Sequence, residues 1–249
     1  MNTTTTTHPV KCRYCGETYQ CDEPNPGFMD RFCKTCEDSI ESGEQEREQR
    51  TLEKEISKTI ARLTPPRFRQ TDIHHPAFNR RLWEQVKAWN PTDEIPWLGL
   101  IGETGLCKTR TGYSRLEEVV RTPKRLQYSH RKMESLVCET SIEAITSSSF
   151  ADAVRNQYSK HAEEARDCKN LLDSAHSVKW LLFDDLGKFT NTPAILAALF
   201  SVIDHRHNFN RPMIWTANLD PTEFLASAPA DIGAPLAGRL IECSTIITV

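Results

Sequence analysis

The chain has little of what marks a membrane protein, a secreted protein or a general coat for nucleic acid. Its longest apolar run, around Ala194 to Ile203, is too short to cross a bilayer and indicates a core helix. Met1 to Thr7 is a polar tract rich in threonine, not a signal peptide. The formal net charge of −3 over 249 residues leaves no surplus of positive charge. We therefore expect a cytoplasmic protein with no membrane partner, whose residues 1–8 form a disordered tail.

One glycine is missing from the segment with the clearest chemical signal. Residues 99–109 read GLIGETGLCKT, which fits the phosphate-binding pattern G-x-x-x-x-G-K-[ST], except that Cys107 replaces the last glycine. In such a loop, backbone N–H groups surround the phosphates, the lysine reaches the terminal ones and the hydroxyl binds Mg²⁺. An apolar run precedes the loop and residues 108–121 predict a helix after it, as this chemistry requires. The expected nucleotide-binding residues are Gly102, Glu103, Thr104, Gly105, Leu106, Cys107, Lys108, Thr109 and Arg110.

Cys107 leaves the strength of nucleotide binding open. A Cβ where the loop calls for positive φ costs on the order of 1 kcal/mol or more. If this strain is the whole effect, affinity falls about tenfold and the site survives. If the loop refolds to avoid a clash, binding is lost. A thiol beside Lys108 at a helix N-terminus is also open to oxidation, so redox control of the site is a further hypothesis.

An apolar strand that ends in two acids predicts the second half of the site. Residues 178–188 read VKWLLFDDLGK, the Walker B form, in which a carboxylate at the end of the strand helps to hold Mg²⁺. Asp184 is the expected magnesium ligand together with Thr109, and Asp185 is expected to polarise the attacking water. The alternative is a strand followed by an ordinary polar turn.

Two further side chains are candidates for catalysis. Asn218 follows the apolar run of residues 211–217 and can contact the γ-phosphate or orient the water, although a lone asparagine is often a turn former. Arg239 lies on an expected short helix before the last strand. It can reach the nucleotide of a neighbouring subunit as an arginine finger, or it can be a solvated or salt-bridged arginine.

The N-terminal region carries a separate metal-binding pattern. Cys12, Cys15, Cys33 and Cys36 form C-x₂-C-x₁₇-C-x₂-C, which predicts a closed, structural Zn²⁺ site with four thiolates. Two disulfides are the alternative, but they need an oxidising compartment. Cys21 and His8 are competing ligands that do not fit the two-knuckle pattern.

The segments around the phosphate-binding loop leave two alternatives open. Residues 37–63 are charged and helix-favouring, so they predict either a solvated connector helix ending before Pro65 and Pro66 or a disordered linker. Basic residues are dense from Lys108 to Lys132, and they predict either a stripe along single-stranded DNA or a solvated face.

These segments together resemble the DnaC/DnaI-type helicase loaders and the related IstB transposition ATPases of the AAA+ group. The residues that carry the resemblance are TPPRF at 64–68, GETGLCKTR at 102–110, LLFDDLGK at 181–188, IDHR at 203–206, RPMIWTANL at 211–219 and AGRL at 237–240. The likeness covers residues 64–249 and is loose from 111 to 175. It implies that Asn218 is the sensor 1 residue, that Arg239 acts in trans through self-association, and that the C-terminal lid is absent.

We expect a zinc ribbon at residues 9–37, a helical connector at 38–64 and a P-loop domain at 65–249. The domain is a three-layer α/β fold whose five-stranded, mainly parallel sheet has strands near 97–101, 125–130, 178–184, 212–217 and 244–249. The resemblance implies an ATPase that uses ATP, Mg²⁺ and Zn²⁺ and loads a DnaB-type replicative helicase onto single-stranded DNA. The alternatives are an IstB-type transposition helper and a nucleotide-independent adaptor with a degenerate loop.

Overall fold

The computed structural model describes residues 8–21, 32–69, 71–128 and 133–249. Residues 1–7 of the expected tail, and Arg131 and Lys132 of the basic stretch, lie outside this part of the chain. Two compact units are distinguished: residues 1–55 with 125–137, and residues 56–124 with 138–249. Each unit is described by itself.

The first unit contains two small antiparallel sheets and most of a long helix. Strands β1 (His8–Lys11) and β2 (Thr18–Cys21) form one hairpin, and β4 (Lys124–Tyr128) and β5 (Met133–Val137) form the other. Helix α1 (Lys34–Leu63) begins inside the second cysteine pair and ends before Pro65, so residues 37–63 are helical. Within this unit the Leu136 N–H donates to Glu48 Oε1 at 2.7 Å.

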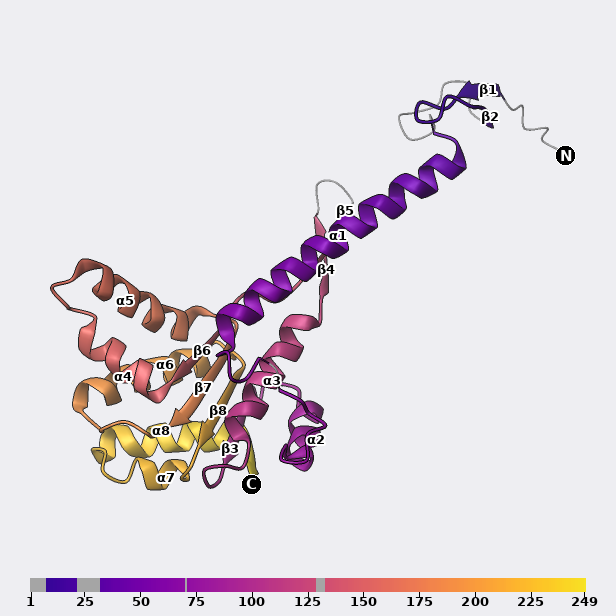
Figure 1. Ribbon diagram of the computed structural model, residues 1–249. Helices are drawn as coiled ribbons and strands as arrows, with labels where there is room; N and C mark the ends of the chain where they lie inside the picture. The colour runs from indigo at the N-terminus through magenta and orange to yellow at the C-terminus, as the bar shows by residue number, and fades with distance from the viewer. Residues whose placement is uncertain (1–7, 22–31, 70, 129–132) are drawn as a thin grey trace, which may run out of the picture. The chain divides into compact units, whose positions relative to one another are not determined.

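The second unit is built on a fully parallel five-stranded sheet with the order β6-β7-β8-β3-β9 (Figure 1). Its strands are β3 (Trp97–Ile101), β6 (Ile142–Thr146), β7 (Trp180–Leu186), β8 (Met213–Ala217) and β9 (Ser244–Thr248). In the register, β3 lies between β8 and β9, with Trp97 opposite both Met213 and Ser244. The predicted five-stranded parallel sheet is therefore confirmed.

One of the five predicted strands was assigned to the wrong sheet. The strand predicted at 125–130 is β4, which pairs with β5 in a separate hairpin, and the edge position belongs to β6. Because β6 has a single neighbour, β7, only Ile142 and Ile145 are buried along it. It therefore lacks the continuous apolar run that marks a strand buried on both faces.

Seven helices of the described chain belong wholly to this unit. They are α2 (Arg80–Ala88), α3 (Lys108–Arg121), α4 (Ser147–Asn156), α5 (Ala162–Ser177), α6 (Pro193–Asn208), α7 (Pro221–Phe224) and α8 (Ala230–Glu242), preceded by the last turns of α1. Helix α3 has the predicted bounds. A capping box of Thr146 and Ser149 starts α4, and a break at 157–161 separates α5 from it.

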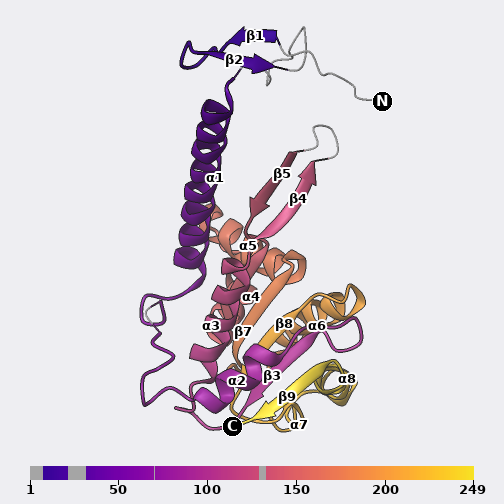
Figure 2. The same cartoon turned by 90° about the vertical axis from the view of Figure 1, so that its right-hand side faces the viewer.

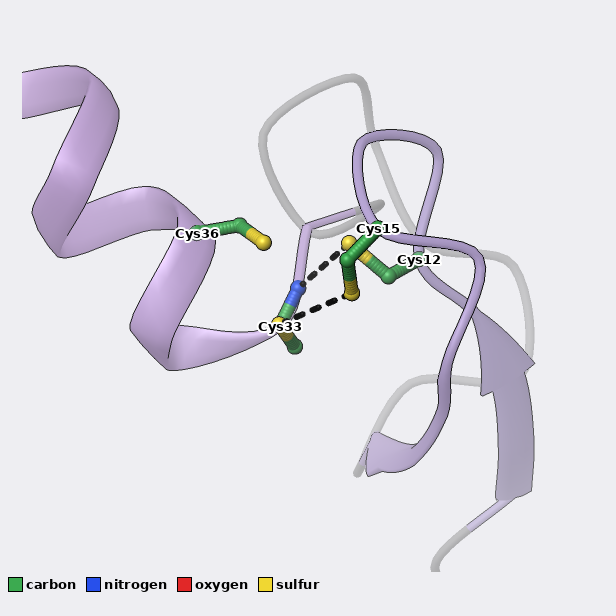
Figure 3. A group of neighbouring side chains, drawn as sticks. All are labelled: Cys12, Cys15, Cys33 and Cys36. Carbon is green, nitrogen blue, oxygen red and sulfur yellow. Dashed lines mark hydrogen bonds between the residues drawn. The ribbon is translucent and has the colours of Figure 1, made fainter.

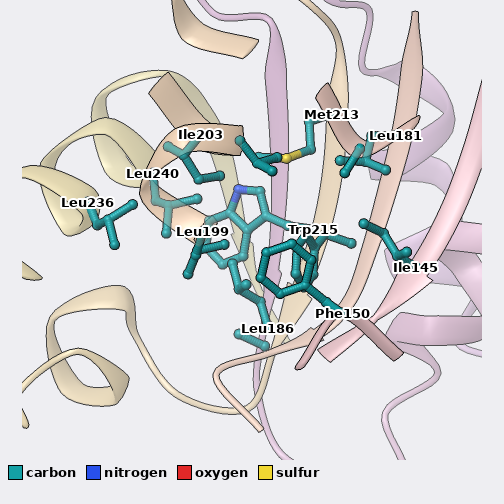
Figure 4. Close-up of a cluster of buried hydrophobic side chains, with 14 of the residues drawn as sticks. Ile145, Phe150, Leu181, Leu186, Leu199, Ile203, Met213, Trp215, Leu236 and Leu240 are labelled. Atoms are coloured by element: carbon teal, nitrogen blue, oxygen red, sulfur yellow. The ribbon is translucent and has the colours of Figure 1, made fainter. Parts of the chain in front are cut away.

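Alternate residues of the central strands face the two helical layers. Leu181, Phe183 and Trp215 pack in one large cluster with side chains of α4, α5, α6 and α8 (Figure 4). On the opposite face, a Cβ at Gly112 of α3 would lie 3.0 Å from Leu182. Figure 2 shows α3 and α6 on opposite sides of the sheet. The arrangement is thus the predicted three-layer α/β fold.

Arg206 forms hydrogen bonds with the chain at the amino-terminal ends of two neighbouring strands. Its guanidinium is fully buried and donates to the carbonyl oxygens of Ala175, Val178, Lys179 and Pro212 at 2.5–3.1 Å. These carbonyls lie at the end of α5, before β7 and before β8. In the part of the chain that is described, no helix is long and apolar enough to cross a membrane.

Candidate functional site

A cavity of about 370 Å³ lies where β3, β7 and β8 end at the carboxyl edge of the sheet. This is the edge at which parallel α/β sheets bind ligands. The residues that line it are Arg67, Phe68, Thr104, Gly105, Leu106, Cys107, Lys108, Thr109, Arg110, Asp185, Lys188 and Asn218. Most of the residues predicted from sequence therefore meet in one cavity; Gly102 and Glu103 lie in the same loop, which starts at the end of β3.

Cys107 takes the backbone conformation that a glycine would have. Its φ of 67° and ψ of 11° are left-handed, and it is the N-cap of α3. Gly105, two residues earlier, has φ 94°. The thiol of Cys107 is turned toward the carbonyl oxygen of Ala77, to which it donates at 3.4 Å. The loop keeps the curl expected of a phosphate-binding loop, with a cysteine in the strained position.

Lys108 is buried in the centre of the loop. Its Nζ donates to the carbonyl oxygens of Gly102 and Glu103 at 2.6 and 2.7 Å. Burial lowers the pKa of Lys108, and the charge of Asp185 partly opposes this change. Because both of its partners are neutral, an anionic phosphate is a stronger partner for the ammonium group.

Asp184 receives hydrogen bonds from the hydroxyls of two neighbouring elements. Thr109 Oγ1 of α3 and Thr216 Oγ1 of β8 donate to the same Asp184 Oδ1, at 2.8 and 2.7 Å. Asp184 is only 5% exposed, and this burial raises its pKa while the two hydroxyls oppose the rise. A buried carboxylate beside a threonine hydroxyl is a donor set that suits Mg²⁺. Thr109 and Asp184 would hold the ion.

Asp185 has a fixed backbone and a more exposed carboxylate. Its N–H donates to Thr216 Oγ1 at 2.9 Å, and its carbonyl oxygen accepts from Ser147 Oγ at 2.6 Å. Its carboxylate forms an ion pair with Lys188 Nζ at 2.9 Å. Asp185, which is expected to polarise the attacking water, thus lines the cavity and has the Lys188 ammonium group beside it.

The structure places Asn218 and Arg239 at different distances from the loop. Asn218 Nδ2 donates to Thr104 Oγ1 at 3.2 Å, so this side chain contacts the phosphate-binding loop. Arg239 does not line the cavity of its own chain. It pairs with Asp204 at 2.7 Å and its guanidinium lies 4.7 Å from the ring centre of Phe200, which agrees with the salt-bridged alternative in the isolated chain.

Sequence reasoning missed Arg67 and Phe68 as site residues. Phe68 stacks on Tyr113 with ring centres 5.2 Å apart, and the Arg67 guanidinium lies 4.4 Å from the Phe68 ring centre. Both residues line the cavity, where Phe68 is buried and Arg67 is exposed. Their signal was the TPPRF segment, in which an arginine and an aromatic residue directly follow the prolines that end α1.

Two basic residues of the stretch from Lys108 to Lys132, Lys108 and Arg115, are buried. Arg115 is buried and donates to Glu118 Oε2 at 2.6 Å and to the Trp89 carbonyl oxygen at 3.0 Å. Lys108 lies inside the cavity. These two cations are therefore used within the fold and are not part of a stripe for single-stranded DNA.

The four cysteines of the N-terminal pattern come together in one cluster (Figure 3). Cys12 and Cys15 lie on the knuckle after β1, while Cys33 and Cys36 lie at the start of α1. Their sulfur atoms are all within 4.8 Å of one another, and Cys15 Sγ and Cys33 Sγ are 3.8 Å apart. Tetrahedral zinc–thiolate bonds of about 2.3 Å require sulfur separations of about 3.8 Å, so the cluster fits Zn²⁺.

The environment of the cluster favours a bound cation. Burial tends to raise the pKa of Cys12, but backbone hydrogen bonds from Cys15, Cys33 and Tyr14 outweigh it and lower that pKa to about 6. The neighbouring Cys33 side chain raises the pKa of Cys36. A thiol that ionises readily therefore opposes ionisation of its neighbours unless a cation is present. All nine cysteines are described and free of disulfides, as the zinc interpretation expects.

Comparisons with known proteins show where this fold is found. No protein-family model and no curated protein matches the chain. The crystal structure of the DnaC helicase loader is 17% identical, with a TM-score of 0.50 over 74% of this chain and 99% of that one. A putative primosome component from Streptococcus pyogenes serotype M3 is 16% identical, with a TM-score of 0.51 over 77% and 94%.

A third solved structure has the same fold. A DNA replication initiation factor is 15% identical, with a TM-score of 0.50 over 75% of this chain and 50% of its own, so the chain spans about half the length of that protein. At such identities the likeness shows the fold alone. The fold is the P-loop α/β fold of AAA+ proteins, which confirms the expected fold class.

Proposed function

We propose that this chain is an ATP-binding DNA replication protein that hydrolyses ATP and loads a replicative helicase onto single-stranded DNA. The observation that carries the proposal is the shared Asp184 oxygen. Thr109 reaches it from the phosphate-binding loop and Thr216 from the next strand, at 2.8 and 2.7 Å. A decayed loop would have no need for a buried carboxylate aligned with its threonine, because an isolated buried acid is costly.

The cavity residues divide the work of binding and hydrolysis. Backbone N–H groups of residues 103–109 surround the phosphates and Lys108 leaves its two carbonyl partners for the β- and γ-phosphates. Bound Mg²⁺ would supply positive charge that stabilises those phosphates, and Thr109 and Asp184 would hold the ion. The exposed Arg67 guanidinium, which lies over the Phe68 ring, offers a flat surface for the base.

Hydrolysis places a water molecule between Asp185 and the γ-phosphorus. The water oxygen forms a bond to phosphorus while the bond from phosphorus to the β–γ bridging oxygen breaks. Asp185 accepts the water proton, Asn218 orients the γ-phosphate, and ADP carries the leaving oxygen. Arg239 of a neighbouring chain stabilises the transferred charge, which requires it to exchange Asp204 for the nucleotide.

The N-terminal zinc ribbon, residues 9–37, is the proposed grip on a DnaB-type helicase. The connector of residues 38–64 joins it to the ATPase domain of residues 65–249. The zinc site of the ribbon is structural because four cysteines fill the coordination shell and leave no position for water. The fold that this chain shares with the solved helicase loader and the putative primosome component supports a role in DNA replication.

Nucleotide binding by Lys108→Ala tests the ATPase part of the proposal. We expect the variant to lose measurable ATP binding in calorimetry with Mg²⁺, and the wild type to bind and hydrolyse ATP. Arg121→Ala is a matched control, because Arg121 ends the same helix with an exposed side chain. A wild type indifferent to ATP would leave the adaptor alternative, which the strained Cys107 favours.

Binding to a purified DnaB-type helicase tests the partner. The full chain is compared with Cys12→Ser and with Cys168→Ser, a control at a cysteine outside the cluster. Loss of helicase binding in the first variant alone is expected. Equal binding by both would contradict the proposed role of the ribbon without affecting the ATPase.

A further inference from the structure

Lys188 is a second cation at the nucleotide cavity. It lines the cavity with Lys108 but belongs to the turn after β7 and not to the phosphate-binding loop. Its Nζ lies 2.9 Å from Asp185 Oδ1, and this is the partner of Asp185 among the ion pairs of the described residues. The charges of Asp185 and Lys188 both act on the pKa of Lys108, in opposite directions. The three groups therefore form one electrostatic cluster.

The backbone that carries Asp185 and Lys188 is fixed on several sides. Asp185 has φ 58°, and its carbonyl oxygen accepts from Ser147 Oγ at 2.6 Å and from the Lys188 N–H at 3.0 Å. Gly187 has φ 91°, and a Cβ there would lie 2.7 Å from Phe224. A rearrangement at this turn would therefore involve the side chains of Asp185 and Lys188 and not the backbone.

The ion pair between these side chains is easily exchanged. The side chain of Lys188 is 46% exposed and that of Asp185 is 34% exposed. Exposed ion pairs of this kind contribute little to stability. A terminal phosphate carries more negative charge than a carboxylate and accepts stronger hydrogen bonds from ammonium groups. A nucleoside triphosphate in the cavity would therefore bind the Lys188 ammonium group more strongly than the Asp185 carboxylate does.

We propose that Lys188 is a positioning residue that exchanges Asp185 for the terminal phosphate of a bound nucleoside triphosphate. The inference rests on the proposed function. In the empty site Lys188 neutralises Asp185. When the triphosphate binds, Lys188 contacts it and leaves the carboxylate free to accept a proton from water. A diphosphate offers no γ-phosphate, so Lys188 stays with Asp185 and the cavity distinguishes the two nucleotides.

The test compares a non-hydrolysable ATP analogue with ADP on the full, zinc-containing chain. In calorimetry with Mg²⁺, Lys188→Met is expected to weaken analogue binding about tenfold and to leave ADP binding within about twofold. Lys188→Arg keeps the cation and is expected to restore most of the preference for the triphosphate. Lys179→Met is the matched control, because Lys179 is a half-exposed lysine paired with Glu139 and does not line the cavity.

The outcomes separate this inference from the proposed function. Wild-type binding that depends on Lys108, with an unchanged preference for the analogue over ADP in Lys188→Met, overturns the inference alone. A wild type that binds neither nucleotide overturns both. Lys188→Gln is a second removal of the charge, so a fall in the preference confined to the methionine variant would also count against the exchange.

Discussion

The thiol of Cys107 donates a hydrogen bond to the backbone carbonyl oxygen of Ala77, which lies 30 residues earlier in the chain. The contact ties the phosphate-binding loop to the segment before α2. It also shows how a cysteine is accommodated where a glycine is usual: the backbone keeps φ at 67° and the side chain finds a partner outside the loop.

Replacing Cys107 by glycine is expected to change little. A non-glycine residue in the left-handed region costs about 1–2 kcal/mol, but glycine gives up a similar amount through the freedom of the unfolded chain. We expect the free energy of unfolding in urea to stay within about 1 kcal/mol and ATP affinity within about threefold. Cys107→Val is expected to destabilise by about 1–3 kcal/mol, because a β-branched residue resists positive φ. A gain in affinity above about tenfold in Cys107→Gly would mean that the Cβ obstructs the phosphates.

Asp184 makes the metal-free protein less stable as the pH rises. Burial raises its pKa in the folded chain above that of an unfolded aspartate, so the folded state binds this proton more tightly. The stability contributed by the proton is present below the unfolded pKa and is lost as pH rises through the folded pKa. We therefore expect Asp184→Asn to be more stable than the wild type near pH ~7, with a smaller difference near pH ~4, in urea unfolding without Mg²⁺. Asp152→Asn is the exposed control; a less stable Asp184→Asn at neutral pH would contradict the argument.

Zinc is expected to be needed by the cysteine cluster and not by the P-loop domain. The purified chain should contain about one Zn²⁺ by metal analysis, and Cys36→Ser should lose it. Cys21→Ser should keep it, since Cys21 lies at the end of β2, outside the cluster. Removal of zinc with a chelator, followed by exchange into buffer with Mg²⁺ and no chelator, should leave Lys108-dependent nucleotide binding intact. Metal retained by Cys36→Ser would point to another ligand set.

Arg239 is expected to act across a subunit boundary. We expect Arg239→Ala to lower ATP hydrolysis by about a hundredfold or more while nucleotide affinity stays the same. Mixing this variant with Lys108→Ala should restore part of the activity, because each chain supplies what the other lacks. Asp204→Asn, which frees Arg239 from its partner in the same chain, serves as the control. The absence of any recovery in the mixture would place Arg239 in a structural role.

The sequence predicts the parts of this fold that are buried or chemically constrained. The phosphate-binding loop, the helix at 108–121 and the buried strands β3, β7 and β8 follow from motifs and apolar runs. The edge strand β6 does not, because one exposed edge weakens its apolar pattern. The start of α4 at Ser147 depends on the Thr146 cap, a local hydrogen bond that helix periodicity does not reveal.

The sequence predicts which residues form the candidate site, but not which of their side chains contact one another. Motif spacing predicts Lys108, Thr109 and Asp184 as site residues, because the motif gives each a fixed position relative to the phosphates of a nucleotide. The exchange partner of Asp185 and the neighbour of Cys107 depend on where turns bring side chains together. Lys188 is three residues from Asp185 in the chain, yet only the positive φ at Asp185 and Gly187 turns it back toward the carboxylate.

The four hydrogen bonds that Arg206 donates to backbone carbonyl oxygens limit motion at one end of the sheet. They restrain the entry points of β7 and β8 through a side chain that has no exposed surface. The opposite ends of the same strands carry Asp184, Asp185 and Asn218. The sheet is therefore restrained at the end opposite the cavity, and we expect a ligand bound there to move the loops at the carboxyl edge more than the strands.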